Sequence, residues 1–396
     1  MTQSALDPSL LDRVRSYQDE LSTIRRDIHA HPELGLQEYR TAELVARKLE
    51  EWGMEVHRGV GKTGVVGVLR NGNGQASVGL RADMDALPIL EATGLPHASQ
   101  NPGRMHACGH DGHTTMLLGA AKYLAETRNF NGTVYFIFQP AEEGVGGALE
   151  MLKDGLFERF PCGSVYGMHN RPGLPVGKFT TGPGARAAGG AFFDISITGK
   201  GAHGAYPHQS IDPIVVACHL GTALQSIVSR NISAQDTAVL SITRIQSGDA
   251  YNVVPQSAVM AGTVRAMKPE VMTMVEQNMK RLAASIAAGF GAEATVDFRL
   301  IFAPMVNNEA ETIAYADAAA ALVGEDNVRR DGLPGMGSED FSFMMEKVPG
   351  AHINLGNGDS AALHNHLYDF NDETIPYGVA LYGAIVEKKL PKGVTE

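Results

Sequence analysis

The sequence is poor in the features that indicate a secreted, membrane-bound or nucleic-acid-binding protein. Its 396 residues include only three cysteines, too few for a disulfide framework. It has no apolar run approaching the roughly 18 residues of a membrane-spanning helix, and its first residues lack the basic and apolar regions of a signal peptide. Acidic residues outnumber basic ones by 44 to 33, which gives a net charge of −11. We therefore expect a cytoplasmic globular protein that binds neither membranes nor nucleic acid.

The expected order of helices and strands changes in the middle of the chain. Helix and strand patterns alternate over about the first 190 residues, which is typical of βαβ units and a largely parallel sheet. A glycine-rich stretch at 182–190 has the composition of a hinge or linker. The order βαββαβ follows over 191–301 and is typical of a small ferredoxin-like domain.

We therefore predict an α/β protein of two domains. The first has a mixed, mainly parallel sheet flanked by helices, beginning with a helix over 8–30, and the second is an inserted ferredoxin-like βαββαβ domain. The expected boundaries are 1–186 for the first part of the larger domain, 187–303 for the insertion, and 304–396 for the second part of the larger domain.

Carboxylate and imidazole side chains follow three of the expected strands of the larger domain. Because the carboxyl ends of the strands in an open α/β sheet form its usual active-site edge, we expect these side chains to gather there. They are Asp83 and Asp85 after the first of these strands, Glu142 and Glu143 after the second, and His169 after the third.

The sharpest cluster is the segment MHACGHDGH at 105–113. Cys108 and His110 are separated by Gly109, which permits an unusual backbone angle, so both side chains can face one ion. A thiolate together with imidazoles suits a borderline divalent metal. The alternative is a histidine-rich loop whose cysteine is merely buried.

The pair Glu142–Glu143 and the segment around His364 extend this candidate site. If a turn brings both glutamates to one place, one carboxylate can bind metal while its neighbour acts as a general base. The alternative is a solvated pair on the surface. His364 has a competitor in His366, two residues further along.

The sequence resembles the amidohydrolase branch of the aminoacylase/carboxypeptidase metallopeptidases. That branch includes hippurate hydrolases, N-acyl-amino-acid amidohydrolases and plant indole-acetyl-amino-acid hydrolases. The resembling segments run in order over almost the whole chain: HPELGLQEYRTAELV (31–45), LRADMDALPI (80–89), HACGHDGHTTMLLGAA (106–121), FQPAEEG (138–144), GMHN (167–170), GAHGAYPHQSIDPI (201–214), NVVPQSAVMAGTVRA (252–266), GSEDF (337–341) and LHNHLYDFND (363–372).

The resemblance implies a site for two divalent metal ions, of zinc, manganese, cobalt or nickel. Cys108 matches the group that bridges the metals; other branches have an aspartate there, and a histidine where Asp83 stands. The implied ligands are Cys108, His110, Glu143, His169 and His364.

The resemblance also implies roles beyond the metals. Glu142 matches the general base, and Asp85 matches an aspartate that orients a metal-binding side chain. His203 matches a histidine of the inserted domain that helps to polarise the substrate carbonyl, often across a dimer interface. Asn252 and Arg265 match substrate-binding positions, with a turn residue and a surface ion pair as the respective alternatives.

One segment departs from the resemblance, and one matching segment has no assigned role. His364-Asn365-His366 stands where relatives commonly have Ser-Pro after the first histidine. The flanking Leu363 and Tyr368 favour His364 as the ligand, with His366 as a possible substitute. The motif residues Ser338-Glu339-Asp340 have a place near the implied site but no assigned role.

The predicted function is that of a metal-dependent amidohydrolase. It would cleave the amide bond of N-acyl amino acids, such as hippurate-like compounds, with water activated at the metals and by Glu142. The resemblance implies a homodimer or homotetramer formed through the inserted domain, which also serves as a lid. The alternatives are a dipeptidase or carboxypeptidase on the same metal core, and a non-catalytic metal-binding protein.

Overall fold

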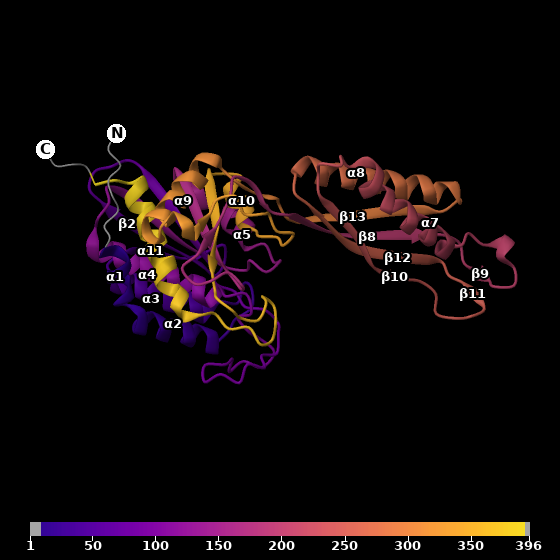
Figure 1. Cartoon of the computed structure of the whole chain (residues 1–396). Coiled ribbons are helices and arrows are strands. Elements are labelled where there is room, and N and C mark those ends of the chain that lie inside the picture. Colours follow the sequence, from indigo (N-terminus) through magenta and orange to yellow (C-terminus); the bar gives the residue numbers. More distant parts are fainter. Residues whose placement is uncertain (1–8, 393–396) are drawn as a thin grey trace. The chain divides into compact units, whose positions relative to one another are not determined.

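The structure is a computed structural model that describes residues 9–392, and it divides the chain into two compact units (Figure 1). Unit 1 comprises the chain up to Arg186, together with Val306–Leu333 and the residues from Asp340 onward. Unit 2 comprises Ala187–Met305 and Pro334–Glu339. Within residues 9–392, none of the helices combines the length and apolar character that crossing a membrane requires.

Unit 1 is built on a mixed sheet in the order β1-β2-β4-β3-β5-β16-β6-β15. Its centre, β4-β3-β5-β16, is parallel throughout, whereas β1 and β2 pair antiparallel at one side. The central strands are almost continuously buried because helices cover both of their faces. The strand bounds are β1 Glu55–Val60, β2 Gly64–Asn71, β3 Ser77–Asp83, β4 Gly132–Gln139, β5 Ser164–Arg171, β6 Phe179–Thr180, β15 Val328–Arg329 and β16 Gly350–Gly356.

The helices of unit 1 pack around this sheet, and α4 occupies the middle of the core. It contacts β3 on one side and both α2 and α11 on the other, so nearly all of its residues are buried. The helix bounds are α1 Ser9–Arg15, α2 Gln18–Ala30, α3 Tyr39–Glu51, α4 His110–Thr127, α5 Gly147–Lys153, α6 Leu156–Arg159, α9 Glu309–Val323, α10 Phe341–Met345 and α11 Ile375–Lys389.

Unit 2 has the predicted order βαββαβ, here β8-α7-β10-β12-α8-β13. Its antiparallel sheet runs β10-β12-β8-β13, which is the strand order of ferredoxin-like domains. A small pair of strands, β9 and β11, extends from it. The bounds are β8 Gly189–Thr198, β9 Ala202–His203, α7 Pro213–Ser226, β10 Ala238–Gln246, β11 Val253–Val254, β12 Ser257–Ala266, α8 Pro269–Gly289 and β13 Glu293–Phe302.

Three local features differ from the sequence-based expectation. The single helix expected over 8–30 is interrupted by a tighter turn, in which the Ser16 N–H donates to the Arg13 carbonyl and the Tyr17 N–H to the Val14 carbonyl, both at 3.0 Å. Strand β1 was not predicted, since its six residues show no apolar alternation and only Val60 is buried. Residues 334–339, expected in the larger domain, belong to unit 2, where the Gly337 carbonyl accepts the Ala188 N–H at 3.0 Å.

Candidate metal centre

The carboxyl ends of neighbouring parallel strands in unit 1 carry the candidate side chains. Strand β3 ends at Asp83, the turn after β4 holds Glu142 and Glu143, and His169 lies near the end of β5. The next strand, β16, leads into the loop that contains His364. Segments far apart in the sequence therefore deliver carboxylates and imidazoles to one edge of the sheet.

Gly109 sets the local geometry of the Cys108–His110 segment. Its φ of +92° lies in the left-handed region, and it precedes the first residue of α4. A Cβ atom on Gly109 would stand 2.4 Å from Asn170 Oδ1 and 2.8 Å from the Tyr368 hydroxyl, so only glycine fits. This turn brings the Cys108 thiol and the His110 ring within ligand distance of a common point.

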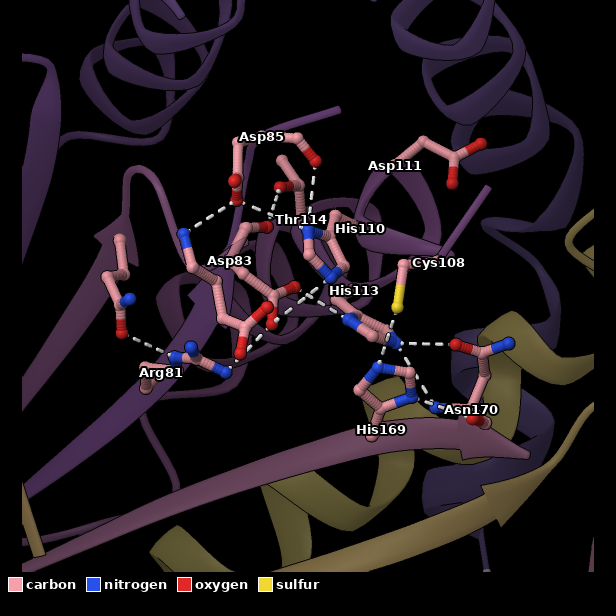
Figure 2. Close-up of polar contacts among 12 residues, drawn as sticks. Arg81, Asp83, Asp85, Cys108, His110, Asp111, His113, Thr114, His169 and Asn170 are labelled. Atoms are coloured by element: carbon pink, nitrogen blue, oxygen red, sulfur yellow. Dashed lines mark hydrogen bonds and ion pairs between the residues drawn. The ribbon is translucent and has the colours of Figure 1, made fainter. Parts of the chain in front are cut away.

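Cys108, His110 and His169 form what we call the buried group. Their potential ligand atoms all lie within 4.8 Å of one another, and Cys108 Sγ is 3.3 Å from His169 Nε2 (Figure 2). His110 Nδ1 donates to the Asp85 carbonyl at 2.9 Å, and His169 Nδ1 donates to the Asn170 carbonyl at 2.7 Å. Because a carbonyl only accepts, each ring keeps its Nε2 lone pair for a metal.

Cys108, Glu143 and His364 form a second set, which we call the exposed group. Their ligand atoms also lie within 4.8 Å of one another, and His364 Nε2 is 3.2 Å from Glu143 Oε1. The His364 side chain is 52% exposed, in contrast to the buried ring of His110. Cys108 is the member common to both groups.

Two buried atoms indicate that these groups fit metal ions. Within residues 9–392, the buried His110 Nε2 has no hydrogen-bond partner, and the buried Glu143 Oε1 has only its 3.2 Å ion pair with His364 Nε2. An unpaired buried lone pair is costly unless something such as a cation engages it. The donor set of thiolate, imidazole and carboxylate suits borderline divalent metals.

The pKa shifts of the candidate ligands come from burial and from their charged or hydrogen-bonding neighbours. Hydrogen bonds to Cys108 and Glu143 raise the pKa of His364 to about 10. Burial raises the pKa of the Cys108 thiol, and the nearby Glu143 carboxylate adds to that shift. Burial alone would lower the pKa of His110, but Asp83 and Cys108 raise it well above its ordinary value. A divalent cation can take the place of these protons, because ligands bind metal in their deprotonated forms.

The turn after β4 directs Glu142 and Glu143 toward the same place. Ala141 has a φ of +52°, and the two amides that follow it donate to the Asp85 carboxylate, Glu142 N at 2.9 Å and Glu143 N at 3.0 Å. Glu142 is buried, and its carboxylate lies within 4.8 Å of ligand atoms of both His110 and Glu143. Asp85 thus holds this turn with its side chain, while its main-chain carbonyl orients His110.

A buried polar chain behind the buried group was missed by the sequence analysis. His113 Nδ1 lies 2.6 Å from Asp83 Oδ1, and His113 Nε2 lies 2.8 Å from Asn170 Oδ1 (Figure 2). Burial alone would raise the pKa of Asp83, but His110, His113 and Arg81 hold it well below its ordinary value. The spacing of His110 and His113, three residues apart at the start of a helix, was the available signal.

A second buried network joins the segments that carry the ligands. Asp111, the neighbour of His110, lies 2.8 Å from His29 Nδ1 and 3.6 Å from Arg25 Nη1. Arg25 also donates to Asp369 at 2.9 Å and to Asp372 at 2.6 Å, in the segment that follows His364. Arg25 and His29 are four residues apart on α2 and share one face of it. Helix α2 therefore links the start of α4 to the His364 segment.

Further candidate residues lie in unit 2 and are described with that unit alone. His203 and Asn252 are close together, because the Gly204 amide donates to the Asn252 carbonyl at 2.7 Å and His203 pairs with Val253. Arg265 is at the other end of the sheet, where its guanidinium donates to Thr263 Oγ1 at 2.9 Å. Unit 2 thus keeps Arg265 apart from the pair of His203 and Asn252.

The remaining motif residues differ in their surroundings. Ser338 and Glu339 belong to unit 2, whereas the buried Asp340 lies in unit 1, where it accepts from Gln139 Nε2 at 2.6 Å. His366 is exposed, and its carbonyl accepts the Ala92 N–H at 2.9 Å. His364, and not His366, is the member of the exposed group.

Comparison with known proteins identifies the family of the chain. The model of peptidase family M20/M25/M40 matches residues 79–388. Over 383 residues the chain is 44% identical to hippurate hydrolase of Campylobacter jejuni, covering 96% of this chain and all (100%) of that one. It is 41% identical over 364 residues to N-acetylcysteine deacetylase of Bacillus subtilis, covering 91% of this chain and 94% of the relative.

A solved structure extends the comparison to the whole fold. The crystal structure of a dinuclear metal-binding peptidase of family M20 from Bacillus subtilis aligns with a TM-score of 0.83 and 36% identity, covering 94% of this chain and 98% of that one. The family model spans most of the chain, and the relatives are matched over nearly their full lengths. The chain therefore belongs to peptidase family M20/M25/M40, in its amidohydrolase branch.

Proposed function

We propose that the chain hydrolyses N-acyl amino acids at a site for two divalent metal ions. The observation that carries the proposal is the membership of Cys108 in both ligand groups, since one thiolate placed between two groups suits two neighbouring ions. The similarity to hippurate hydrolase and N-acetylcysteine deacetylase supports the substrate class, because both names denote enzymes that act on N-acyl amino acids.

The residues that would hold the ions divide between the two groups. His110 and His169 would bind one ion, Glu143 and His364 would bind the other, and Cys108 would contact both. Zinc, manganese, cobalt and nickel all accept this donor set. When bound, such ions act as Lewis acids and lower the pKa of a bound water.

Glu142 is proposed as the general base. Its buried carboxylate adjoins His110 and Glu143, so it is placed to take a proton from the attacking water. The water oxygen forms a bond to the amide carbonyl carbon. The carbon–nitrogen bond then breaks, and Glu142 passes the proton to the leaving amine. The products are a carboxylic acid and a free amino acid.

His203 is proposed to polarise the substrate carbonyl, with Asn252 and Arg265 binding the substrate. His203 Nδ1 accepts the Ala205 N–H at 3.0 Å, so Nε2 carries the ring proton and can donate to a carbonyl oxygen. His203 is exposed, as a residue that meets substrate from a mobile lid has to be. Unit 2 is proposed as that lid and as the interface of a homodimer or homotetramer; exposed apolar side chains beside His203, namely Tyr206, Tyr251 and Val253, support an interface.

A substrate panel with the Glu142→Gln variant tests the proposed function. Metal-free protein is reloaded with zinc, manganese, cobalt or nickel and assayed on hippurate, other N-acyl amino acids and dipeptides. We expect turnover of N-acyl amino acids, and a loss of about 10²- to 10⁴-fold in kcat in Glu142→Gln at unchanged metal content. Wild-type turnover in that variant would rule out the base, and a preference for dipeptides would favour the peptidase alternative.

A further inference from the structure

We infer that Glu38 is a positioning residue that holds the turn carrying Glu142 and Glu143. The inference rests on the proposed function for its catalytic consequence, but its structural basis lies in contacts of unit 1 alone. Glu38 belongs to the resembling segment 31–45, has no assigned role, and precedes α3 in the sequence. More than a hundred residues separate it from the glutamate pair.

The Glu38 carboxylate is fully buried and accepts three hydrogen bonds. Oε1 accepts the Ala141 N–H at 2.8 Å and the Leu36 N–H at 3.0 Å, while Oε2 accepts the Thr63 hydroxyl at 2.5 Å. Burial raises the pKa of Glu38 to about 7, against the opposing effect of the Thr63 hydrogen bond. A carboxylate is an expensive group to bury, so its presence here calls for a specific reason.

The reason lies in the backbone of Ala141. Its φ of +52° is in the left-handed region, which is unfavourable for any residue with a Cβ atom. The loop that contains Gly35 packs closely against Ala141. A Cβ atom placed on Gly35 would lie only 3.0 Å from the Ala141 Cβ. Such a conformation persists only where the surroundings hold it, and the bond from the Ala141 amide to Glu38 supplies that restraint.

Two buried carboxylates thus fix three successive amides of this turn. Glu38 accepts the Ala141 amide, and Asp85 accepts the amides of Glu142 and Glu143. Without Glu38, the buried Ala141 amide would have no acceptor and the positive φ would lose its support. The turn would then relax toward extended backbone, in which adjacent side chains point to opposite sides, so Glu142 and Glu143 could not both face the ligand cluster.

Three variants separate this role from general stabilisation. In Glu38→Ala we expect kcat to fall by about 100-fold and metal affinity to fall by about 10- to 100-fold, as for other groups that orient metal ligands. Glu38→Gln should stay within about 3-fold of wild type, because an amide oxygen still accepts the Ala141 N–H. In the double variant Glu38→Ala/Ala141→Gly, we expect at least about 10-fold of the lost kcat to return, since glycine adopts a positive φ without steric cost.

Glu33 provides a matched control in the same segment. Its carboxylate accepts the amides of Arg40 at 3.0 Å and Thr41 at 2.9 Å at the start of α3, but it makes no bond to the glutamate turn. Glu33→Ala should lower thermal stability without changing metal affinity or kcat. Equal losses of kcat and metal affinity in Glu33→Ala and Glu38→Ala would overturn the inference.

Two readouts keep the inference testable independently of the substrate. Manganese binding to the metal-free chain, measured by calorimetry, and amide hydrogen exchange at 141–143 report on the turn whether or not N-acyl amino acids are substrates. Exchange should quicken in Glu38→Ala and much less in Glu38→Gln. If Glu38→Ala does not fold, Glu38→Gln and Ala141→Gly decide: a loss above about 10-fold in metal affinity in either one contradicts the account. A folded Glu38→Ala with wild-type exchange and metal affinity also overturns it.

Discussion

The buried group and the exposed group share Cys108 but are held in different ways. His110, at a helix start, is buried, His169, on a strand, is half-buried, and both have their second ring nitrogens bound to main-chain carbonyls. His364 is half exposed and stands in a loop at a φ of +62°, fixed there by a 2.7 Å bond from its amide to the Ala107 carbonyl. We therefore expect the two proposed ions to bind with unequal strength, the tighter one in the buried group.

Removal of the shared residue should have the largest effect. In Cys108→Ala both groups lose a ligand, so we expect metal content to fall below one ion per chain and kcat to fall by more than about 10³-fold. Elemental analysis after gel filtration and steady-state assays would measure both. Cys162→Ala is the control, since that thiol lies outside both groups and should leave metal content unchanged. Two bound ions in Cys108→Ala would show that the groups do not depend on a common thiolate.

Variants of single histidines distinguish metal binding by the buried group from metal binding by the exposed group. His364→Ala should weaken only the second ion, leaving one ion per chain and kcat reduced by about 10²- to 10³-fold. His110→Ala should weaken the tighter ion, with a loss of affinity of more than about 100-fold. Calorimetric titration of each metal-free variant distinguishes these outcomes, and His366→Ala serves as the control with near wild-type binding. Equal weakening of both ions by His364→Ala would remove the distinction between the groups.

An Arg25 variant tests whether the exposed group depends on the ion pairs that hold the segment after His364. Arg25→Met removes the bonds to Asp369 and Asp372, so amide exchange over 357–372 should quicken and the second ion should bind about 10-fold more weakly. Arg26→Met is a matched control from the same helix, because Arg26 is exposed and its pair with Asp372 is worth about 1 kcal/mol or less. If exchange over 357–372 is the same in both variants, Arg25 does not hold this segment.

The smallest expected effect is a pH dependence of the free energy of unfolding, caused by His29. Burial alone would lower the pKa of His29, but the hydrogen bond to Asp111 raises it from 6.5 to about 9. The protonated form is therefore favoured in the folded chain, and its stabilising contribution is complete below pH 6.5 and is lost as the pH rises through about 9. Urea midpoints of the metal-free chain should fall over this interval more steeply in wild type than in His29→Gln. If the urea midpoints of wild type and His29→Gln fell equally with pH, the raised pKa of His29 would be contradicted.

The sequence predicts the clustering of these side chains where residue type and strand position coincide. The spacing of Cys108 and His110, and the position of Glu142 and Glu143 after a buried strand, place them at one edge of the sheet, where their ligand atoms do lie close together; their roles as ligands and base stay predictions. The hydrogen bonds of Glu38 and of the Asp85 carboxylate could not be predicted from side-chain pattern, because both bind main-chain amides of a segment distant in sequence; only the resemblance gave Asp85 an orienting role. No side-chain pattern records which amide a carboxylate will meet after folding.

The fold shows the same division. The βαββαβ order of unit 2 follows from local periodicity, and local periodicity is readable in sequence. The break between α1 and α2 is a single tight turn at Ser16 and Tyr17, and the placement of 334–339 with unit 2 goes with pairing to residues 187–188, which are distant in sequence. Hydrogen bonds of this kind set the ends of helices and domains, but residue composition does not reveal them.

The most direct test of the central claim is a cobalt titration of the metal-free chain, followed by the absorption of the cobalt–thiolate charge transfer. Because Cys108 belongs to both ligand groups, the account predicts two ions per chain, bound in a tight and a weaker step that each change the thiolate absorption. Hydrolysis of hippurate should reach its full rate only after the second step. A single bound ion, or a second step that leaves the thiolate absorption unchanged, would contradict the account.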